Sequence, residues 1–381
     1  MTSRERLLRT FRREETDRAP IAPFLYYNNV YEMFGYKPSV EKFFDPDDFD
    51  PIQKFIEYCQ YFGFDALHTL GSVWDAYTID KPGQDWDVKV SFEGDEDGGR
   101  QVTAIRTPGG ELRQIKDYRR SSTYLVVSAI QDYLIKTKQD FEILVRYAPP
   151  LDAINCGLVR RARSTIEENG LVVAQTHGAF NVLNQFRKLD DLLIDPLVDE
   201  GFYRSMMDYF LGWLLKQAIK IVQAGADVVE FTGNTATSMV GPRFFQQYVL
   251  EYENRLARAI HEAGAFSIYH NCGDAARIMH LYNEMDIDVW GYLTPPPYGD
   301  VDLDEALRVV RPDMVLRGNI DQVEFMMKAT PDEVRNRVRE VLLKVRTRGN
   351  WILSTTDFFF DGTPYQNIQA FTEAGREFGS Y

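Results

Sequence analysis

The sequence predicts a (β/α)8 barrel, and two observations support this. Short apolar runs rich in β-branched and aromatic residues alternate with longer stretches of helical period, which is the pattern of parallel strands joined by helices. There are eight such runs, the number that closes a barrel of this kind. They span residues 21–27, 64–71, 171–178, 226–233, 266–273, 288–293, 314–321 and 351–359.

The stretches between the later runs have clear helical signals. Apolar residues recur every three or four positions in 202–223, 242–264 and 331–350. Pro242 suits a first helical turn, and Gly225 and Gly264 suit the residue after a last turn. We therefore expect these helices to cover the outside of the barrel.

Residues 85–118 break this alternation. Apolar and polar residues alternate there around DEDGG and PGG turns, which predicts antiparallel β-hairpins. We expect a single domain of residues 1–381 with this insertion at about 80–125, after the second barrel strand. A helical stretch from about 140 to 168 should follow it. An insertion on the catalytic face would cover the active site.

Composition excludes several classes of protein. The formal net charge is −14, which disfavours nucleic acid and anionic membranes as partners. No apolar run reaches the roughly 18 residues of a membrane span, and the charged N-terminus is unlike a secretory signal. Three cysteines in 381 residues fit a reducing cytoplasm. We expect a cytoplasmic protein, and exposed aromatic residues make a homodimer plausible.

His270 and Cys272 form the sharpest candidate site. Catalytic groups of such barrels lie at the C-terminal ends of the strands. Residues two apart face the same side of a strand, so these two side chains should point together if the fifth strand persists to 272. Imidazole and thiolate together favour zinc. The alternative is a core histidine beside a buried cysteine.

Two carboxylates extend this candidate metal site. Glu230 lies in an apolar strand, where an ionised carboxylate is costly unless it is paired or bound to a metal. Asp357 ends the eighth strand. Either could instead be structural, Glu230 in an ion pair at the barrel rim and Asp357 as a loop or helix cap. We predict Glu230, His270 and Asp357 as catalytic residues and Glu230, His270, Cys272 and Asp357 as metal ligands.

Aromatic and polar residues at the same rim are candidates for substrate binding. An aromatic group there could hold a ring, although most aromatic stripes are ordinary core. Motifs for dinucleotide binding, the Walker loop and the G-x-S-x-G elbow are absent from the sequence. The predicted substrate-binding residues are Tyr26, Tyr27, His177, Asn234, Tyr292 and Phe358.

Several segments together resemble the uroporphyrinogen-decarboxylase-like superfamily over nearly the whole chain. They are 3–8 (SRERLL), 17–21 (DRAPI), 225–227 (GAD), 242–245 (PRFF), 260–264 (IHEAG), 318–321 (GNID), 362–364 (GTP) and 367–368 (NI). The resemblance implies a (β/α)8 barrel. True decarboxylases of the family carry an arginine-containing segment after strand one, whereas residues 23–29 (PFLYYNN) contain no arginine.

The branch that the sequence resembles is the corrinoid-dependent methyltransferases, which bind zinc through H-x-C on strand five and a cysteine after strand eight. His270 and Cys272 match the first part, but Asp357 stands at the second position. One thiolate with carboxylates is a harder Lewis acid than two thiolates. The resemblance therefore implies a zinc-dependent transfer of methyl from a methoxylated, aromatic donor to corrinoid on a separate protein (O-demethylation). The alternatives are a methylcorrinoid:thiol (coenzyme M-type) methyltransferase, a metal-free lyase of the superfamily, and a barrel that only binds a ligand or scaffolds a partner.

Overall fold

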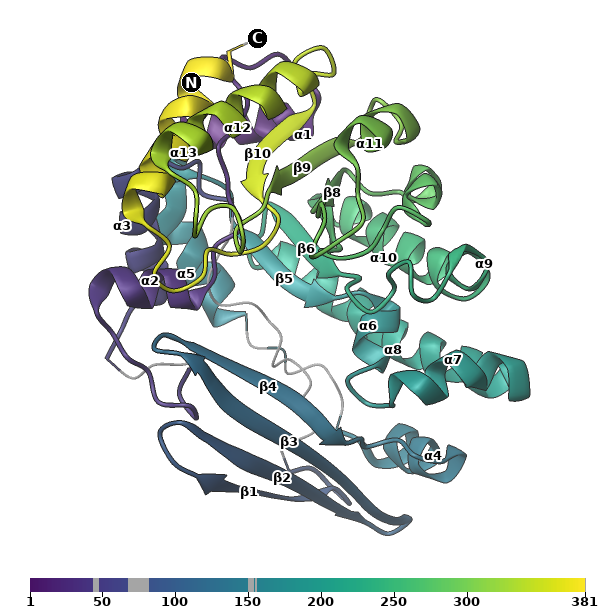
Figure 1. Ribbon diagram of the computed structural model, residues 1–381. Coiled ribbons are helices and arrows are strands. Elements are labelled where there is room, and N and C mark those ends of the chain that lie inside the picture. Colours follow the sequence, from purple (N-terminus) through teal and green to yellow (C-terminus); the bar gives the residue numbers. More distant parts are fainter. Residues whose placement is uncertain (44–47, 68–81, 150–153, 155, 381) are drawn as a thin grey trace.

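The barrel is built on six parallel strands whose ring is closed by two shorter segments (Figure 1). The computed structural model describes residues 1–43, 48–67, 82–149, 154 and 156–380. In spatial order the strands are β10 (Trp351–Thr355), β9 (Val315–Ile320), β8 (Val289–Gly291), β7 (Phe266–His270), β6 (Val228–Thr232) and β5 (Val173–His177).

Single bridges complete the ring between β10 and β5. Ile21 pairs with Leu353 of β10, and Ala66 pairs with Gly170 just before β5. The two segments are joined because the backbone N–H of Asp65 donates to the carbonyl of Ile21. This arrangement confirms the predicted (β/α)8 barrel.

The first strand is shorter than predicted. Pro20 and Pro23 flank the bridge at Ile21, and neither can donate a ladder hydrogen bond, so regular pairing stops there. Tyr27 was expected in strand one but begins helix α2 (Tyr27–Phe34), and this expectation was wrong. Residues 68–71 of the second expected strand lie outside the described residues. The fifth strand was expected to continue to Cys272, but it ends at His270.

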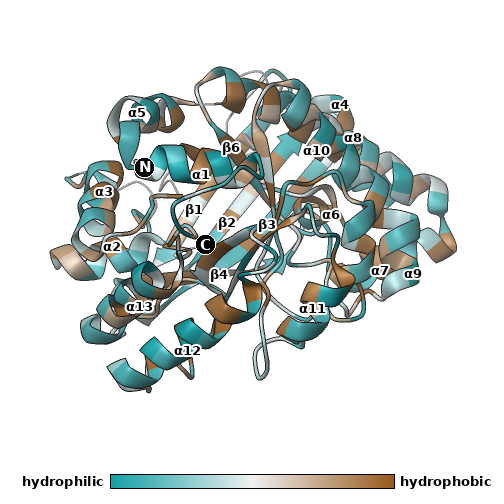
Figure 2. Cartoon of the chain, turned by 90° about the horizontal axis from the view of Figure 1, so that it is seen from above, coloured by the Kyte–Doolittle hydropathy of each residue, from teal (hydrophilic) through white to brown (hydrophobic). Residues whose placement is uncertain are grey.

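Helices surround the barrel and turn their polar faces outward (Figure 2). Residues 242–264, expected as one helix, form α9 (Pro242–Phe244), a π-helical turn (Phe245–Val249) and α10 (Leu250–Glu262). The remaining long helices are α3 (Pro51–Phe62), α4 (Lys138–Tyr147), α5 (Gly157–Ile166), α7 (Leu189–Val198), α8 (Glu200–Gln223), α12 (Pro331–Val345) and α13 (Tyr365–Phe378). Short helical segments are α6 (Ala179–Leu183), α11 (Leu303–Val309), Glu167–Asn169 and Met279–Glu284. In the described part of the chain, no helix combines the length and apolarity needed to cross a membrane.

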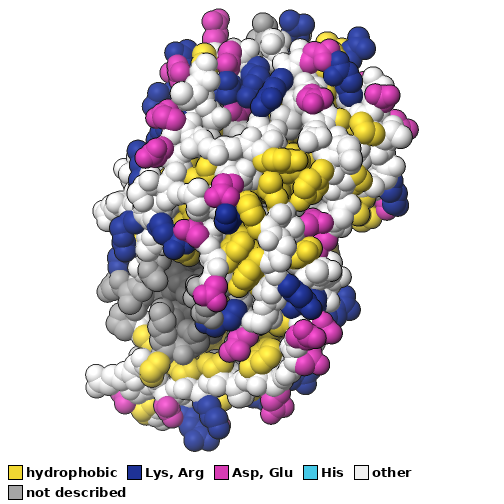
Figure 3. Space-filling model, turned by 90° about the vertical axis from the view of Figure 1, so that its left-hand side faces the viewer, with side chains coloured by type: hydrophobic (Ala, Val, Ile, Leu, Met, Phe, Trp, Pro, Cys, Tyr) yellow, Lys and Arg dark blue, Asp and Glu magenta, His cyan; other side chains and the backbone are white. Residues whose placement is uncertain are grey.

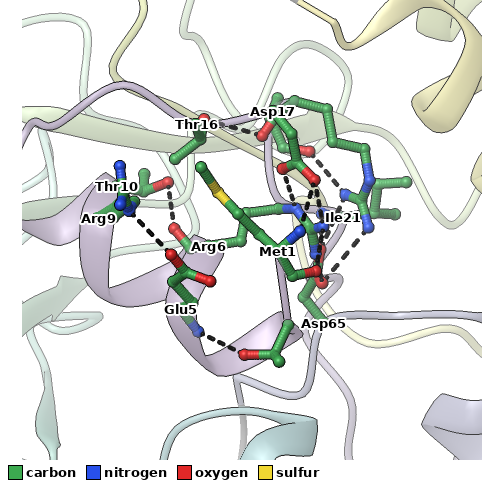
Figure 4. A network of polar contacts seen from close by, with 12 residues as sticks. Met1, Glu5, Arg6, Arg9, Thr10, Thr16, Asp17, Ile21 and Asp65 are labelled. Atoms are coloured by element: carbon green, nitrogen blue, oxygen red, sulfur yellow. Dashed lines mark hydrogen bonds and ion pairs between the residues drawn. The ribbon is translucent and has the colours of Figure 1, made fainter.

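Helix α1 (Ser3–Phe11) packs against one end of the barrel interior. Leu7 and Phe11 are fully buried in a cluster with side chains of the barrel strands, among them Val228 and Ile352. A network of ion pairs holds the helix in place (Figure 4). Its centre is the buried carboxylate of Asp65, which accepts hydrogen bonds from Arg6 at 2.7 Å and Arg18 at 2.9 Å. The buried pairing satisfies Asp65, so this end of the barrel serves stability.

The insertion is a four-stranded antiparallel sheet, in the order β1 (Asp87–Gly94), β2 (Gly98–Thr107), β3 (Gly110–Ser122) and β4 (Leu125–Asp132). It is fixed to loops at the C-terminal side of the barrel strands. Gln114 donates to the carbonyl of Gln185, and the backbone N–H of Tyr124 donates to Asp361. Figure 3 shows apolar side chains exposed on the side of the molecule where the barrel meets this sheet.

Candidate functional site

His270 and Cys272 are brought together at the mouth of the barrel. His270 is the last residue of β7, and the loop that follows carries Cys272 back toward it. Nε2 of His270 lies 3.4 Å from Sγ of Cys272. The prediction that the two side chains lie together is therefore met by the geometry, although the reason is the turn after His270 and not a continuing strand.

Glu230 contacts the other nitrogen of His270. It lies on β6, next to β7, and is fully buried. Its Oε1 is 2.6 Å from Nδ1 of His270 and accepts a further hydrogen bond from Nε2 of Gln175 at 3.2 Å. A carboxylate accepts, so this hydrogen-bond network assigns the ring hydrogen to Nδ1 and leaves the lone pair on Nε2. Glu230 thus lies behind the imidazole, on the side away from Cys272.

Asp357 approaches Cys272 from the loop after β10. Its Oδ2 lies 3.7 Å from Sγ of Cys272, and its Oδ1 accepts from the backbone N–H of Phe358 at 2.8 Å. Gln322 accepts from the backbone N–H of Asp357 at 3.2 Å. Burial raises the pKa of Asp357, and burial together with the nearby Asp357 raises the pKa of the Cys272 thiol well above its usual value. Both shifts favour the neutral, protonated forms of the two groups.

Asn234 completes the surroundings of Cys272. It follows β6, and its Oδ1 accepts from the backbone N–H of Cys272 at 3.2 Å and lies 3.6 Å from Sγ. The thiol is therefore contacted by an imidazole, a carboxylate and an amide oxygen. We call His270, Cys272 and Asp357 the mouth cluster.

The ligand types in the mouth cluster suit zinc, although the structure contains no preformed metal site among the described residues. Among the described residues, no three His, Cys, Asp or Glu side chains already form a group that could hold a metal ion. Ligand atoms of a tetrahedral zinc site with bonds of 2.0–2.3 Å lie about 3.3–3.8 Å apart. The separations of 3.4 Å and 3.7 Å measured from Sγ of Cys272 fall in that range. These two separations are therefore compatible with a shared zinc ion.

Aromatic rings enclose the cluster. Phe24 and Tyr292 contact the His270 ring edge to face, with centroids 5.1 Å and 4.8 Å away. Phe358, beside Asp357, stacks on Tyr26 at 5.2 Å. Tyr26 and Phe358 are only partly buried, so part of each ring remains exposed. Phe24 and Tyr292 are buried and limit how the imidazole can turn.

Tyr27 and His177 contact residues outside the mouth cluster. Tyr27 is buried against other aromatic rings of α2 and its neighbourhood. His177 ends β5, and its Nδ1 lies 2.8 Å from Nδ2 of Asn181 and 3.3 Å from Oγ1 of Thr232. Burial, with a smaller effect of Lys116 on β3, lowers the pKa of His177 to about 3, so its ring is neutral at physiological pH.

Arg317 is the main site residue that sequence reasoning missed. It lies on β9, fully buried, and its Nη1 is 3.4 Å from Oε2 of Glu230. Its signal was visible as a charged residue within the apolar run 314–318 (MVLRG). Gln175, the second partner of Glu230, was visible only as one of several polar residues near the end of the third expected strand.

Known proteins with similar sequences and structures show which family has this architecture. The family model described as "Uroporphyrinogen decarboxylase (URO-D)" matches residues 126–378. A methylated-thiol:coenzyme M methyltransferase of Methanosarcina mazei is 27% identical over a segment that covers 48% of this chain and 46% of that protein. A methylcobamide:CoM methyltransferase of the same organism is 21% identical, over 99% of this chain and 98% of that protein.

A solved structure agrees with the fold. It is described as a methyltransferase from Methanosarcina mazei, and it superposes with a TM-score of 0.71 over 99% of both chains at 15% identity. The family model covers about two thirds of the chain, and its match includes all six strands of the parallel sheet. This chain belongs to the uroporphyrinogen decarboxylase (URO-D) family.

Proposed function

We propose that this protein is a corrinoid-dependent methyltransferase that takes the methyl group from a methoxylated aromatic compound. The observation that carries the proposal is the convergence of His270, Cys272 and Asp357 at the mouth of the barrel, with Cys272 within 3.7 Å of both partners. The names of the two relatives, both methyltransferases, support the reaction class.

In this proposal Nε2 of His270, Sγ of Cys272 and an oxygen of Asp357 would hold a zinc ion. When bound, it would act as a Lewis acid toward the donor oxygen, which makes the phenolate a better leaving group. Glu230 orients His270 from behind and is a supporting residue. In this proposal Asp357 is the third ligand, whereas Glu230, also predicted as a ligand, only supports His270.

The chain's own residues would bind and orient the donor. The partly buried rings of Tyr26 and Phe358 offer stacking surfaces for an aromatic ring beside Asp357. Asn234, whose Oδ1 lies 3.6 Å from Sγ of Cys272, could donate through its amide nitrogen to a substituent of the donor. The antiparallel sheet covers this side of the barrel and would limit access of water.

The methyl acceptor would be the reduced cobalt of a corrinoid on a separate protein. No D-x-H-x-x-G cobalamin motif occurs in the chain. The carbon–oxygen bond of the methoxy group breaks, the methyl group bonds to Co(I), and the phenolate takes a proton from water. We place the enzyme in the cytoplasm, where Cys59, Cys156 and Cys272, all free in the structure, stay reduced.

A second candidate is methyl transfer from a methylcorrinoid to a thiol, the activity class that the names of the relatives favour. The ligand set argues against it, because one thiolate and one carboxylate give a harder metal site than two thiolates. Porphyrinogen decarboxylation has less support. Residues 23–29 carry no arginine, and Arg317 is buried against Glu230.

Cobalt spectroscopy separates these activities. The zinc-loaded protein is mixed with cob(I)alamin and guaiacol, and formation of methylcobalamin is followed by absorbance. A parallel reaction contains methylcobalamin and coenzyme M, and its decay is followed. Methylation from guaiacol that is lost in Cys272→Ala supports the proposal. Activity only with the thiol supports the second candidate, and no activity in either reaction contradicts both.

A further inference from the structure

Arg317 carries a fully buried guanidinium in the interior of the barrel. A buried cation is costly unless its hydrogen bonds are satisfied. Its Nε and Nη2 donate to the carbonyl of Ala22 at 3.2 Å and 3.1 Å, and its Nη1 approaches Oε2 of Glu230 at 3.4 Å. The ring of Tyr292 lies 4.7 Å from its Cζ.

These contacts cross the interior of the barrel. Ala22 is next to the bridge at Ile21, Arg317 is on β9, and Glu230 is on β6. The backbone carbonyl at Ala22 is a fixed point, so the guanidinium cannot follow Glu230 if the carboxylate turns. Glu230 is thereby held with Oε2 toward Arg317 and Oε1 toward Nδ1 of His270.

The geometry requires an arginine. Its planar fork can donate to the carbonyl and the carboxylate at once, with a face left for the Tyr292 ring. A lysine at the same position could carry the charge but has one nitrogen for two acceptors. Tyr292 in turn contacts the His270 ring at 4.8 Å, so the same arginine supports the imidazole from two sides.

We infer that Arg317 is a positioning residue that acts through Glu230: it fixes His270 with hydrogen on Nδ1 and presents Nε2 to the mouth cluster. Outer partners of a ligating histidine set both its tautomer and its orientation. The tautomer itself can be read in the metal-free protein. Only the consequence for metal binding rests on the proposed function.

The direct test is nuclear magnetic resonance of the metal-free protein labelled with [15N]histidine. The chain has five histidines, and the His270 signals are identified by their loss in His270→Asn. In the wild type we expect a protonated Nδ1 and an unprotonated Nε2. In Arg317→Met we expect both nitrogens to be partly protonated. An unchanged His270 pattern in a folded Arg317→Met protein overturns the inference.

Arg187→Met is the matched control. Arg187 is also a buried arginine in a paired geometry, with Nη2 2.7 Å from Oδ1 of Asp195, but it belongs to the connection between α6 and α7. We expect this variant to lose stability and to keep the wild-type His270 signals. If Arg187→Met changes them equally, the effect is general loosening of the barrel, and the inference fails.

Arg317→Lys serves if Arg317→Met does not fold. In this variant we expect the protonation of Nδ1 of His270 to lie between that of the wild type and that expected for Arg317→Met. The lysine can still bind one of the two acceptors, the carbonyl of Ala22 or the carboxylate of Glu230. Zinc affinity, measured by chelator competition, should fall roughly 10–100-fold in Arg317→Met. Wild-type protein that binds no zinc contradicts the proposed function, and the tautomer measurement then still decides the inference.

Discussion

Oε1 of Glu230 lies 2.6 Å from Nδ1 of His270, and the two residues stand on neighbouring parallel strands. This contact determines which side of the imidazole is available. Nε2, the nitrogen left over, faces Sγ of Cys272 at 3.4 Å. Glu230 therefore connects the barrel interior, through Arg317, with His270 of the mouth cluster.

Glu230→Gln tests this relationship. The amide keeps the size of the side chain but removes the charge that pairs with Arg317 and can no longer accept at both positions. We expect zinc affinity to fall roughly 10–100-fold and turnover to be lost, while circular dichroism still shows a folded barrel. Near-normal turnover would mean that Glu230 is only the partner of Arg317 in a structural ion pair.

Cys272→Ser tests the ligand at the centre of the cluster. A hydroxyl binds zinc far more weakly than a thiolate, so the metal content after purification should drop to near zero. The control is Cys156→Ser, since Cys156 precedes α5 and takes no part in the cluster. Equal metal content in both variants would exclude Cys272 as a ligand.

Asp357→Cys tests the link between ligand set and acceptor. A second thiolate makes the site softer, so we expect tighter zinc binding and faster methylation of coenzyme M relative to demethylation of guaiacol. The quantity to measure is the ratio of the two initial rates, because it cancels differences in the active fraction. If the ratio stays at the wild-type value, Asp357 does not select the acceptor.

Glu253 predicts a pH dependence of stability that is separate from the site. It is fully buried on α10, and its carboxylate accepts from the backbone N–H of Ala179 at 3.1 Å. Burial raises its pKa from 4.5 to about 8. The folded protein thus keeps this proton up to about pH 8, whereas the unfolded chain releases it near 4.5, so the free energy of unfolding falls as pH rises between these values.

The slope from one such proton is about 1.4 kcal/mol per pH unit. Glu253→Gln is neutral in both states and lacks this component. Compared with the wild type, it should gain stability steadily with rising pH, by about 4–5 kcal/mol at the upper end of the window. Urea unfolding between pH 5 and pH 8 measures this difference. Parallel stability curves for the two proteins would show that Glu253 is ionised when folded.

The barrel could be predicted from the sequence because six of its strands are runs of apolar residues with sharp ends. The first strand could not be placed well, since Pro20 and Pro23 remove donors and its pairing shrinks to a single bridge at Ile21. Tyr27 was misplaced for the same reason. Its apolar run continues past the bridge, but the backbone turns into α2.

The candidate site, like the barrel, could be predicted from the sequence only in part. His270 and Cys272 could be singled out as chemical types, although the turn that joins them was not foreseen. The position of Glu230 behind His270 depends on the register of β6 with β7, which no local pattern encodes. Arg317 was visible as an anomaly in an apolar strand, but its partners come from two distant strands and required the closed barrel.

The most direct test of the central claim is elemental analysis of the purified, tag-free protein beside His270→Ala. The account predicts about one zinc per chain in the wild type and almost none in the variant, because Nε2 of His270 is proposed as one of three protein ligands. Wild-type protein that stays metal-free after incubation with zinc, or a variant that keeps its zinc, would contradict it.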